Sequence, residues 1–109
     1  MTAEEIVTML ESTGFPVTYL QWPEKAVPNL PYICYYFPNS NNFGADDAVY
    51  QKINALNVEL YTTEKDFTAE ANLESVLFSA SHFWQKSETY LSSEHMYEVL
   101  YQTEVIFNE

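Results

Sequence analysis

The chain has 109 residues, of which 47% are hydrophobic, and this length and composition predict one folded domain with a modest core. Four lysines, no arginine and sixteen acidic residues give a formal net charge of −12, which argues against wrapping nucleic acid or binding anionic membranes. The single cysteine, Cys34, excludes an intrachain disulfide, and its apolar neighbours indicate that it is a small buried hydrophobe.

The N-terminal part of the sequence predicts one helix followed by strands. Thr2 and Glu5 have the spacing of a capping box, which predicts a helix over about residues 3–13 that ends before Gly14. Residues 15–22 and 32–37 are predicted strands, and the unbroken apolar run of the second strand indicates burial on both faces. Residues 38–47 are polar and rich in turn formers, so they predict a projecting hairpin loop.

The C-terminal part predicts a long strand over residues 48–62, a helix over about 67–86, a short strand over 88–92 and a final strand over 96–107. Lys86 is expected near the end of this helix, where its charge complements the helix dipole. The apolar stripe of the helix is Leu73, Val76, Leu77, Ala80, Phe83 and Trp84. This order predicts a single α+β domain over residues 1–109, with an antiparallel sheet of about four to five strands and two helices packed on one face.

The residues that could carry chemistry are few and scattered. His82 and His95 are the only histidines and lie on different predicted elements, so a zinc site lacks its ligands. Asp46 and Asp47 lack the spaced oxygen ligands and the closing glutamate of a calcium-binding EF-hand loop. The chain's two glycines are too far apart for a phosphate-binding loop. We therefore expect no enzyme activity, no metal and no cofactor.

The aromatic residues suggest a different role. Nine tyrosines, seven phenylalanines and two tryptophans exceed what a core of this size can enclose, and such residues are enriched at protein interfaces. We therefore expect a self-associating assembly subunit. The residues that we predict at its interfaces, aromatic side chains together with acids of the loop, are Tyr35, Tyr36, Phe43, Asp46, Asp47, Tyr97 and Tyr101.

Several segments resemble a family of small phage and prophage proteins from Gram-positive bacteria. The resemblance extends over about residues 5–106 and depends on the whole series of segments, none of which is a sharp motif alone. These segments are Pro31–Tyr36, Asn41–Asp46, Tyr50–Ile53, Val58–Thr62 with Lys65 and Asp66, then Glu70, Glu74, Lys86–Tyr90, Glu94 and Met96–Tyr101.

Such proteins are similar to the tail terminator, or tail completion, proteins of long-tailed phages. The resemblance implies a virion protein at the tail end or head-tail joint, which forms a homo-hexameric ring that ends tail-tube growth. The implied partners are the major tail tube protein and the head connector protein, while DNA passes through the ring without specific binding. An acidic lumen suits such a passage, and the residues that we expect to face it are Asp46, Asp47, Glu59, Glu98 and Glu104.

Two other functions remain open at this point. One is a head completion or connector stopper protein, which is also small and oligomeric. The other, from a different class, is an acidic inhibitor or DNA-mimic protein that binds a basic partner. The sequence has no leader-like N-terminus and no apolar run of about 18 residues, so we expect synthesis in the bacterial host cytoplasm and no membrane association.

Overall fold

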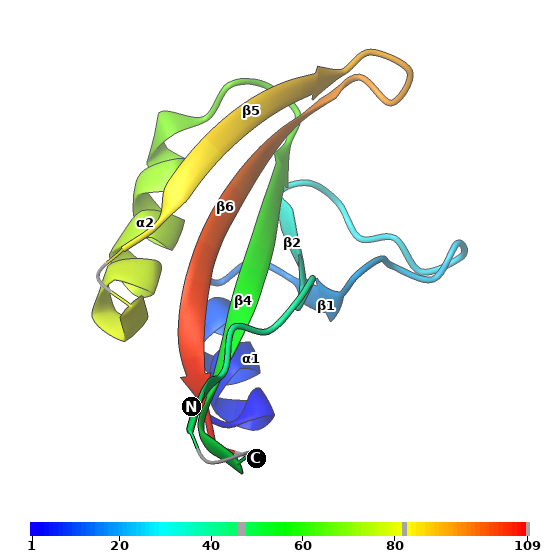
Figure 1. Cartoon of the computed structure of the whole chain (residues 1–109). Coiled ribbons are helices and arrows are strands. Elements are labelled where there is room, and N and C mark those ends of the chain that lie inside the picture. The colour runs from blue at the N-terminus through cyan, green and yellow to red at the C-terminus, as the bar shows by residue number, and fades with distance from the viewer. Residues whose placement is uncertain (46–47, 82, 109) are drawn as a thin grey trace.

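The computed structural model describes residues 1–45, 48–81 and 83–108. The elements in chain order are α1 (Ala3–Glu11), β1 (Val17–Tyr19), β2 (Tyr32–Tyr36), β3 (Phe43–Ala45), β4 (Ala48–Thr62), α2 (Phe67–Ser81), β5 (Gln85–Leu91) and β6 (Met96–Phe107). They form a sheet in the order β1-β2-β4-β6-β5, with β3 paired to β4 beyond this path (Figure 1). The α+β class is confirmed, and its sheet has six strands instead of four to five.

The first helix forms for the reasons visible in the sequence. The hydroxyl of Thr2 accepts from the backbone N–H of Glu5 at 3.1 Å, and the Glu5 carboxylate accepts from the Thr2 N–H at 2.9 Å, so the capping box is confirmed. Gly14 follows the helix at φ +87, a left-handed conformation that glycine adopts readily. Ile6 and Leu10 point from this helix into the core.

Both helices cover the same face of the sheet. Side chains on that face of the sheet form one core with apolar residues of α1 and α2. From the strands this core takes Ile33, Tyr35, Leu56, Val58, Leu60, Val99, Tyr101 and Val105, and from the helices it takes Ile6, Leu10, Ala69, Leu73 and Leu77. Figure 1 shows α2 beside β5 and β6, with the segment between β1 and β2 extending away from it.

The first strand differs from the prediction in length and in direction. β1 covers only Val17–Tyr19, and it pairs parallel with β2, where a fully antiparallel sheet was expected. Leu20 has φ 66, which turns the backbone out of the strand, and residues 20–31 then return the chain to the start of β2. A return of this kind makes the two neighbouring strands run in the same direction.

The predicted helix over 67–86 is too long at its C-terminal end. The helix ends at Ser81, and from Gln85 onward the chain pairs with β6, beginning with Gln85 opposite Gln102. The hydroxyl of Thr103 donates to the Phe83 carbonyl at 2.5 Å, which fixes the chain against β6 just before β5 begins. Phe83 is therefore exposed and outside the buried stripe, Lys86 lies on β5, and His82 lies outside the described residues.

A cluster of charges joins α2 to β5. We call Lys65, Glu70, Glu74, Lys86 and Glu88 the ion cluster. Lys86 Nζ lies 2.7 Å from Glu74 and 3.1 Å from Glu70, while Lys65 Nζ lies 2.7 Å from Glu70 and 2.5 Å from Glu88. The side chain of Glu70 is only 3% exposed. Both lysines therefore neutralise a buried carboxylate between the helix and the edge of the sheet.

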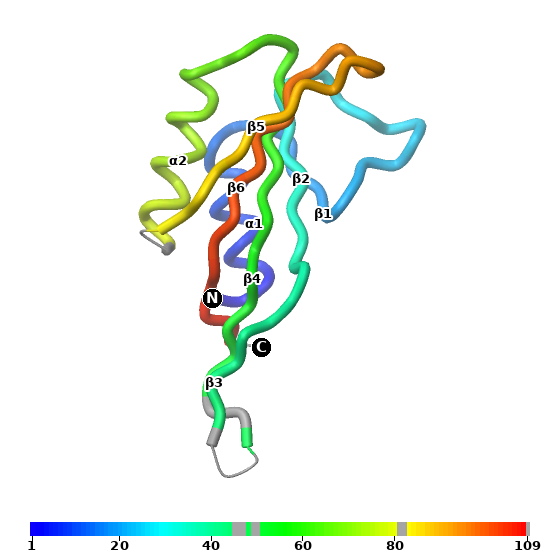
Figure 2. The backbone as a smooth tube through the Cα atoms, turned by 45° about the horizontal axis from the view of Figure 1, so that its top comes forward, coloured from blue at the N-terminus to red at the C-terminus, as the bar shows by residue number. Residues whose placement is uncertain are grey.

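Residues 38–47 are more regular than the predicted loop. Asn39 and Asn41 form backbone hydrogen bonds with β4 at 2.9 and 2.7 Å, and β3 then pairs antiparallel with the start of β4. Figure 2 shows this β3–β4 hairpin projecting beyond the rest of the sheet, in a molecule of 50 × 29 × 24 Å. Asp46 and Asp47 lie outside the described part of the chain.

Candidate functional site

The face of the sheet opposite the helices is the candidate site, and we call it the outer face. Residues that pair directly across neighbouring strands point to the same side of a sheet, so the strand register identifies its members. They are Tyr32, Cys34 and Tyr36 of β2, Ile53, Ala55, Asn57, Glu59 and Tyr61 of β4, Gln85, Ser87, Thr89 and Leu91 of β5, and Met96, Glu98, Leu100, Gln102, Glu104 and Ile106 of β6.

The outer face carries three of the acids predicted to face a lumen. Glu59, Glu98 and Glu104 all lie on it, and no lysine is among its members. The hydroxyl of Tyr61 donates to Glu98 Oε2 at 3.1 Å and holds this carboxylate beside Glu59. The structure therefore brings these three glutamates to one surface, while Asp46 and Asp47 fall outside the described residues.

The negative charge of this surface is partly desolvated. Burial and the neighbouring Glu98 raise the pKa of Glu59. Burial and the same two carboxylates raise the pKa of Tyr61. No lysine contributes to either pKa shift, so Glu59 and Glu98 repel each other without a compensating cation beside them.

We expect Glu59→Gln to stabilise the protein at neutral pH. The folded state raises the pKa of Glu59 above the ordinary 4.5, so as pH rises through this range the unfolded chain loses its proton first and stability falls. The glutamine variant does not lose stability in this way, so its extra stability over the unchanged protein should disappear at pH values well below 4.5. Urea unfolding across this pH range measures the difference, with Glu104→Gln as the exposed control. An advantage that persists in acid would contradict this assignment.

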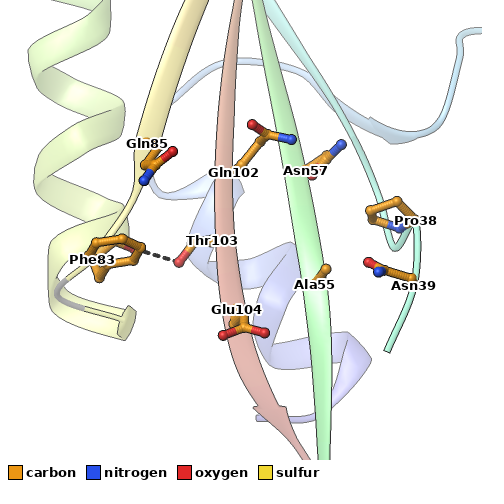
Figure 3. Close-up of a pocket in the computed structure, with 9 residues that line it drawn as sticks. All are labelled: Pro38, Asn39, Ala55, Asn57, Phe83, Gln85, Gln102, Thr103 and Glu104. Carbon is orange, nitrogen blue, oxygen red and sulfur yellow. Dashed lines mark hydrogen bonds between the residues drawn. The ribbon is translucent and has the colours of Figure 1, made fainter. Parts of the chain in front are cut away.

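A groove lined by amides crosses β4, β6 and β5. Asn57, Gln102 and Gln85 are cross-strand partners, and together with Pro38 and Asn39 they border a hollow of about 310 Å³ (Figure 3). Such side chains donate and accept hydrogen bonds, but they supply neither a nucleophile nor a paired acid and base. The groove is therefore suited to contact with another polar surface.

A second hollow, which we call the aromatic cleft, lies between residues 20–27 and the end of the outer face that carries Tyr32, Tyr61 and Met96. It measures about 290 Å³, and its walls include Trp22, Tyr32, Tyr61, Glu94 and Met96. Cys34 also lines the cleft, and burial raises the pKa of its thiol to about 11. The prediction of a buried, unreactive cysteine is consistent with this, because the thiolate is the reactive form.

The aromatic residues predicted at interfaces have different environments. Tyr101 is 0% exposed and Tyr35 is 8% exposed, and both belong to the core beneath the helices, so the expectation of surface contacts fails for them. They point inward because their strand positions alternate with those of the outer face. Tyr36 accepts a hydrogen bond from Asn57 on the outer face, and Tyr97 contacts Tyr90 at 4.9 Å between ring centroids. Phe43 of β3 is 63% exposed.

The sequence analysis did not identify the aromatic cleft or the amide groove. Both depend on which residues become neighbours across strands, and no local pattern specifies that register. Across residues 1–45, 48–81 and 83–108, no group of three or more histidine, cysteine or acidic side chains has the arrangement of a metal site. No helix in these ranges has the length and apolarity needed to cross a membrane.

Comparison with known proteins shows a similarity to a solved structure. No protein-family model matches the sequence, and no curated protein matches it. Among solved structures, the fold is similar to a chain in the virion of a native gene transfer agent (GTA) particle, with a TM-score of 0.60 and 13% sequence identity. The similarity covers 89% of this chain and 84% of that chain. At this identity it establishes a shared fold.

Proposed function

We propose that this protein is a structural subunit of a phage-like virion, and specifically a ring-forming tail terminator at the head-tail joint. The observation that carries the proposal is the fold shared with a chain of a gene transfer agent virion over 89% of this chain. The resemblance of its sequence segments to small phage proteins is an independent argument for the same class.

The distribution of charge supports a role around DNA. The outer face combines Glu59, Glu98 and Glu104 with amides and lacks lysine, whereas Lys65 and Lys86 are held in the ion cluster on the helix side. A channel wall with this composition repels phosphate and lets a duplex slide without being bound. In the proposed ring the outer face lines the lumen.

The shape supports head-to-tail assembly. Among the described strands β1 and β5 are the ends of the sheet order, so each has one edge without a strand partner. The β3–β4 hairpin projects from the same sheet and exposes Phe43. A protruding element and free edges at separate places give a subunit two different surfaces, as the head-to-tail contacts of a ring require.

The size and closure of the assembly test this proposal. We expect a hexamer by light scattering, and rings at the ends of tail tubes by particle imaging when the tube protein is present. A connector stopper would also oligomerise, but it would attach to heads and leave tube ends bare. A protein that stays monomeric with tubes and never caps them would contradict the tail terminator assignment.

A further inference from the structure

The aromatic cleft has an unusual wall. Residues 20–27 follow β1 through two tight turns, in which the Gln21 N–H donates to the Tyr19 carbonyl at 2.8 Å and the Ala26 N–H to the Pro23 carbonyl at 2.9 Å. The Leu20 N–H donates to the Tyr35 carbonyl at 2.8 Å and ties this wall to β2. The cleft is therefore held by the backbone, and its shape exists before anything binds.

Leu20 adopts a conformation that is costly for its residue type. Its φ of 66 lies in the left-handed region, which is unfavourable for a residue with a β-carbon. The result is that Leu20 is 53% exposed at the mouth of the cleft, with Val27 on the same wall 52% exposed. Strain that places apolar side chains in water is a feature of binding sites, where a partner covers them.

The indole N–H of Trp22 is a hydrogen-bond donor without an acceptor among the described residues. The Trp22 ring meets Tyr32 edge-on with centroids 5.9 Å apart, and its Nε1 is buried. A buried donor without an acceptor destabilises the folded protein.

The charge around the cleft is negative. Glu94 lines it, and Tyr61, another lining residue, donates its hydroxyl to Glu98 next to the cleft. Of this chain's four lysines, Lys65 and Lys86 are engaged in the ion cluster, and Lys25 belongs to residues 20–27, the wall of the cleft itself. A second copy, with the same four lysines and a net charge of −12, is therefore a poor occupant.

We propose that the aromatic cleft is a docking site for a basic partner protein, which inserts a lysine or arginine side chain between the tyrosine rings and the carboxylate of Glu94. Aromatic faces attract such a cation, and the carboxylate accepts its N–H groups. Leu20 and Val27 would cover the apolar stem of that side chain. This inference goes beyond the proposed ring, because it assigns the cleft one occupant, a protein that presents an exposed lysine or arginine.

The two tryptophans make the test specific. The probe is the peptide acetyl-Leu-Arg-Leu-amide, titrated into protein labelled with ¹⁵N at tryptophan, and the readout is the indole N–H signal of each ring. We expect a saturable shift of the Trp22 signal, while Trp84, which lies outside the cleft, stays unchanged. The same peptide with citrulline, which is neutral and of similar shape, should bind about tenfold more weakly.

Matched variants complete the test. Glu94→Gln should weaken binding of the arginine peptide by about tenfold, and Glu104→Gln, the same change outside the cleft, should have no effect. An unchanged Trp84 signal reports that each variant is folded. Equal binding of the citrulline peptide, equal shifts of both tryptophans, or no shift at all would overturn the proposal. A Trp22 shift that follows protein concentration without peptide would assign the cleft to a second copy and also overturn it.

Discussion

Replacing both Lys65 and Lys86 by methionine is expected to lower the free energy of unfolding by about 3–5 kcal/mol at neutral pH. The reason is that the Glu70 carboxylate, 3% exposed, would keep its burial and lose both of its cations. Glu74 would retain only the hydrogen bond from the Tyr101 hydroxyl, at 2.8 Å. Urea unfolding monitored by tryptophan fluorescence measures the change.

Two further variants test whether the lost stability comes from the unpaired charge of Glu70 or from the lost packing of the lysine side chains. Adding Glu70→Gln to the lysine pair removes the unpaired charge, and it should restore a large part of the lost stability. Lys25→Met, outside the ion cluster, should change stability by no more than about 0.5 kcal/mol. If the lysine pair proved as harmless as Lys25→Met, the ion cluster would not be what holds α2 against β5.

Reversing the charge of the outer face should convert a repelling surface into one that binds DNA. Glu59→Lys, Glu98→Lys and Glu104→Lys together change the net charge from −12 to −6 and place three cations on one face. We expect the assembled ring to bind duplex DNA with a dissociation constant of about 10⁻⁴ to 10⁻⁶ M, weakening steeply with salt. Particles carrying this variant should release their DNA more slowly.

The matched control makes the same change in net charge, but with residues outside the outer face. Glu4→Lys, Glu24→Lys and Glu64→Lys also give −6, but these exposed residues are not members of the outer face. If the outer face lines the channel, this control should leave DNA release unchanged. Equal slowing by both triple variants would mean that net charge, and not position, controls the passage of DNA.

The elements that were predicted well are those encoded by nearby residues. The capping box of Thr2 and Glu5 marks the start of α1, and the alternation of side chains along β4 and β6 sets their bounds and their faces. The three glutamates of the outer face could be assigned to outward positions for the same reason. Such patterns need no knowledge of the rest of the chain.

What was missed depends on contacts between distant parts of the chain. The parallel pairing of β1 follows from the turn at Leu20, and the early end of α2 follows from pairing between β5 and β6. Lys86 suits a helix terminus by its local context, yet it reaches Glu70 and Glu74 from a strand. Tyr101 looked like a surface aromatic until the register placed it beneath the helices. Tertiary contacts determined each of these outcomes.

The length of tails made without this protein tests its proposed role most directly. We expect a producer strain that lacks the gene to accumulate DNA-filled heads without tails, together with free tails of widely variable length, because nothing would end tube growth. Supplying the gene from a plasmid should restore joined particles with tails of uniform length. Electron micrographs of the lysates measure both distributions. Joined particles with tails of normal length in the deletion strain would contradict the assignment as a tail terminator.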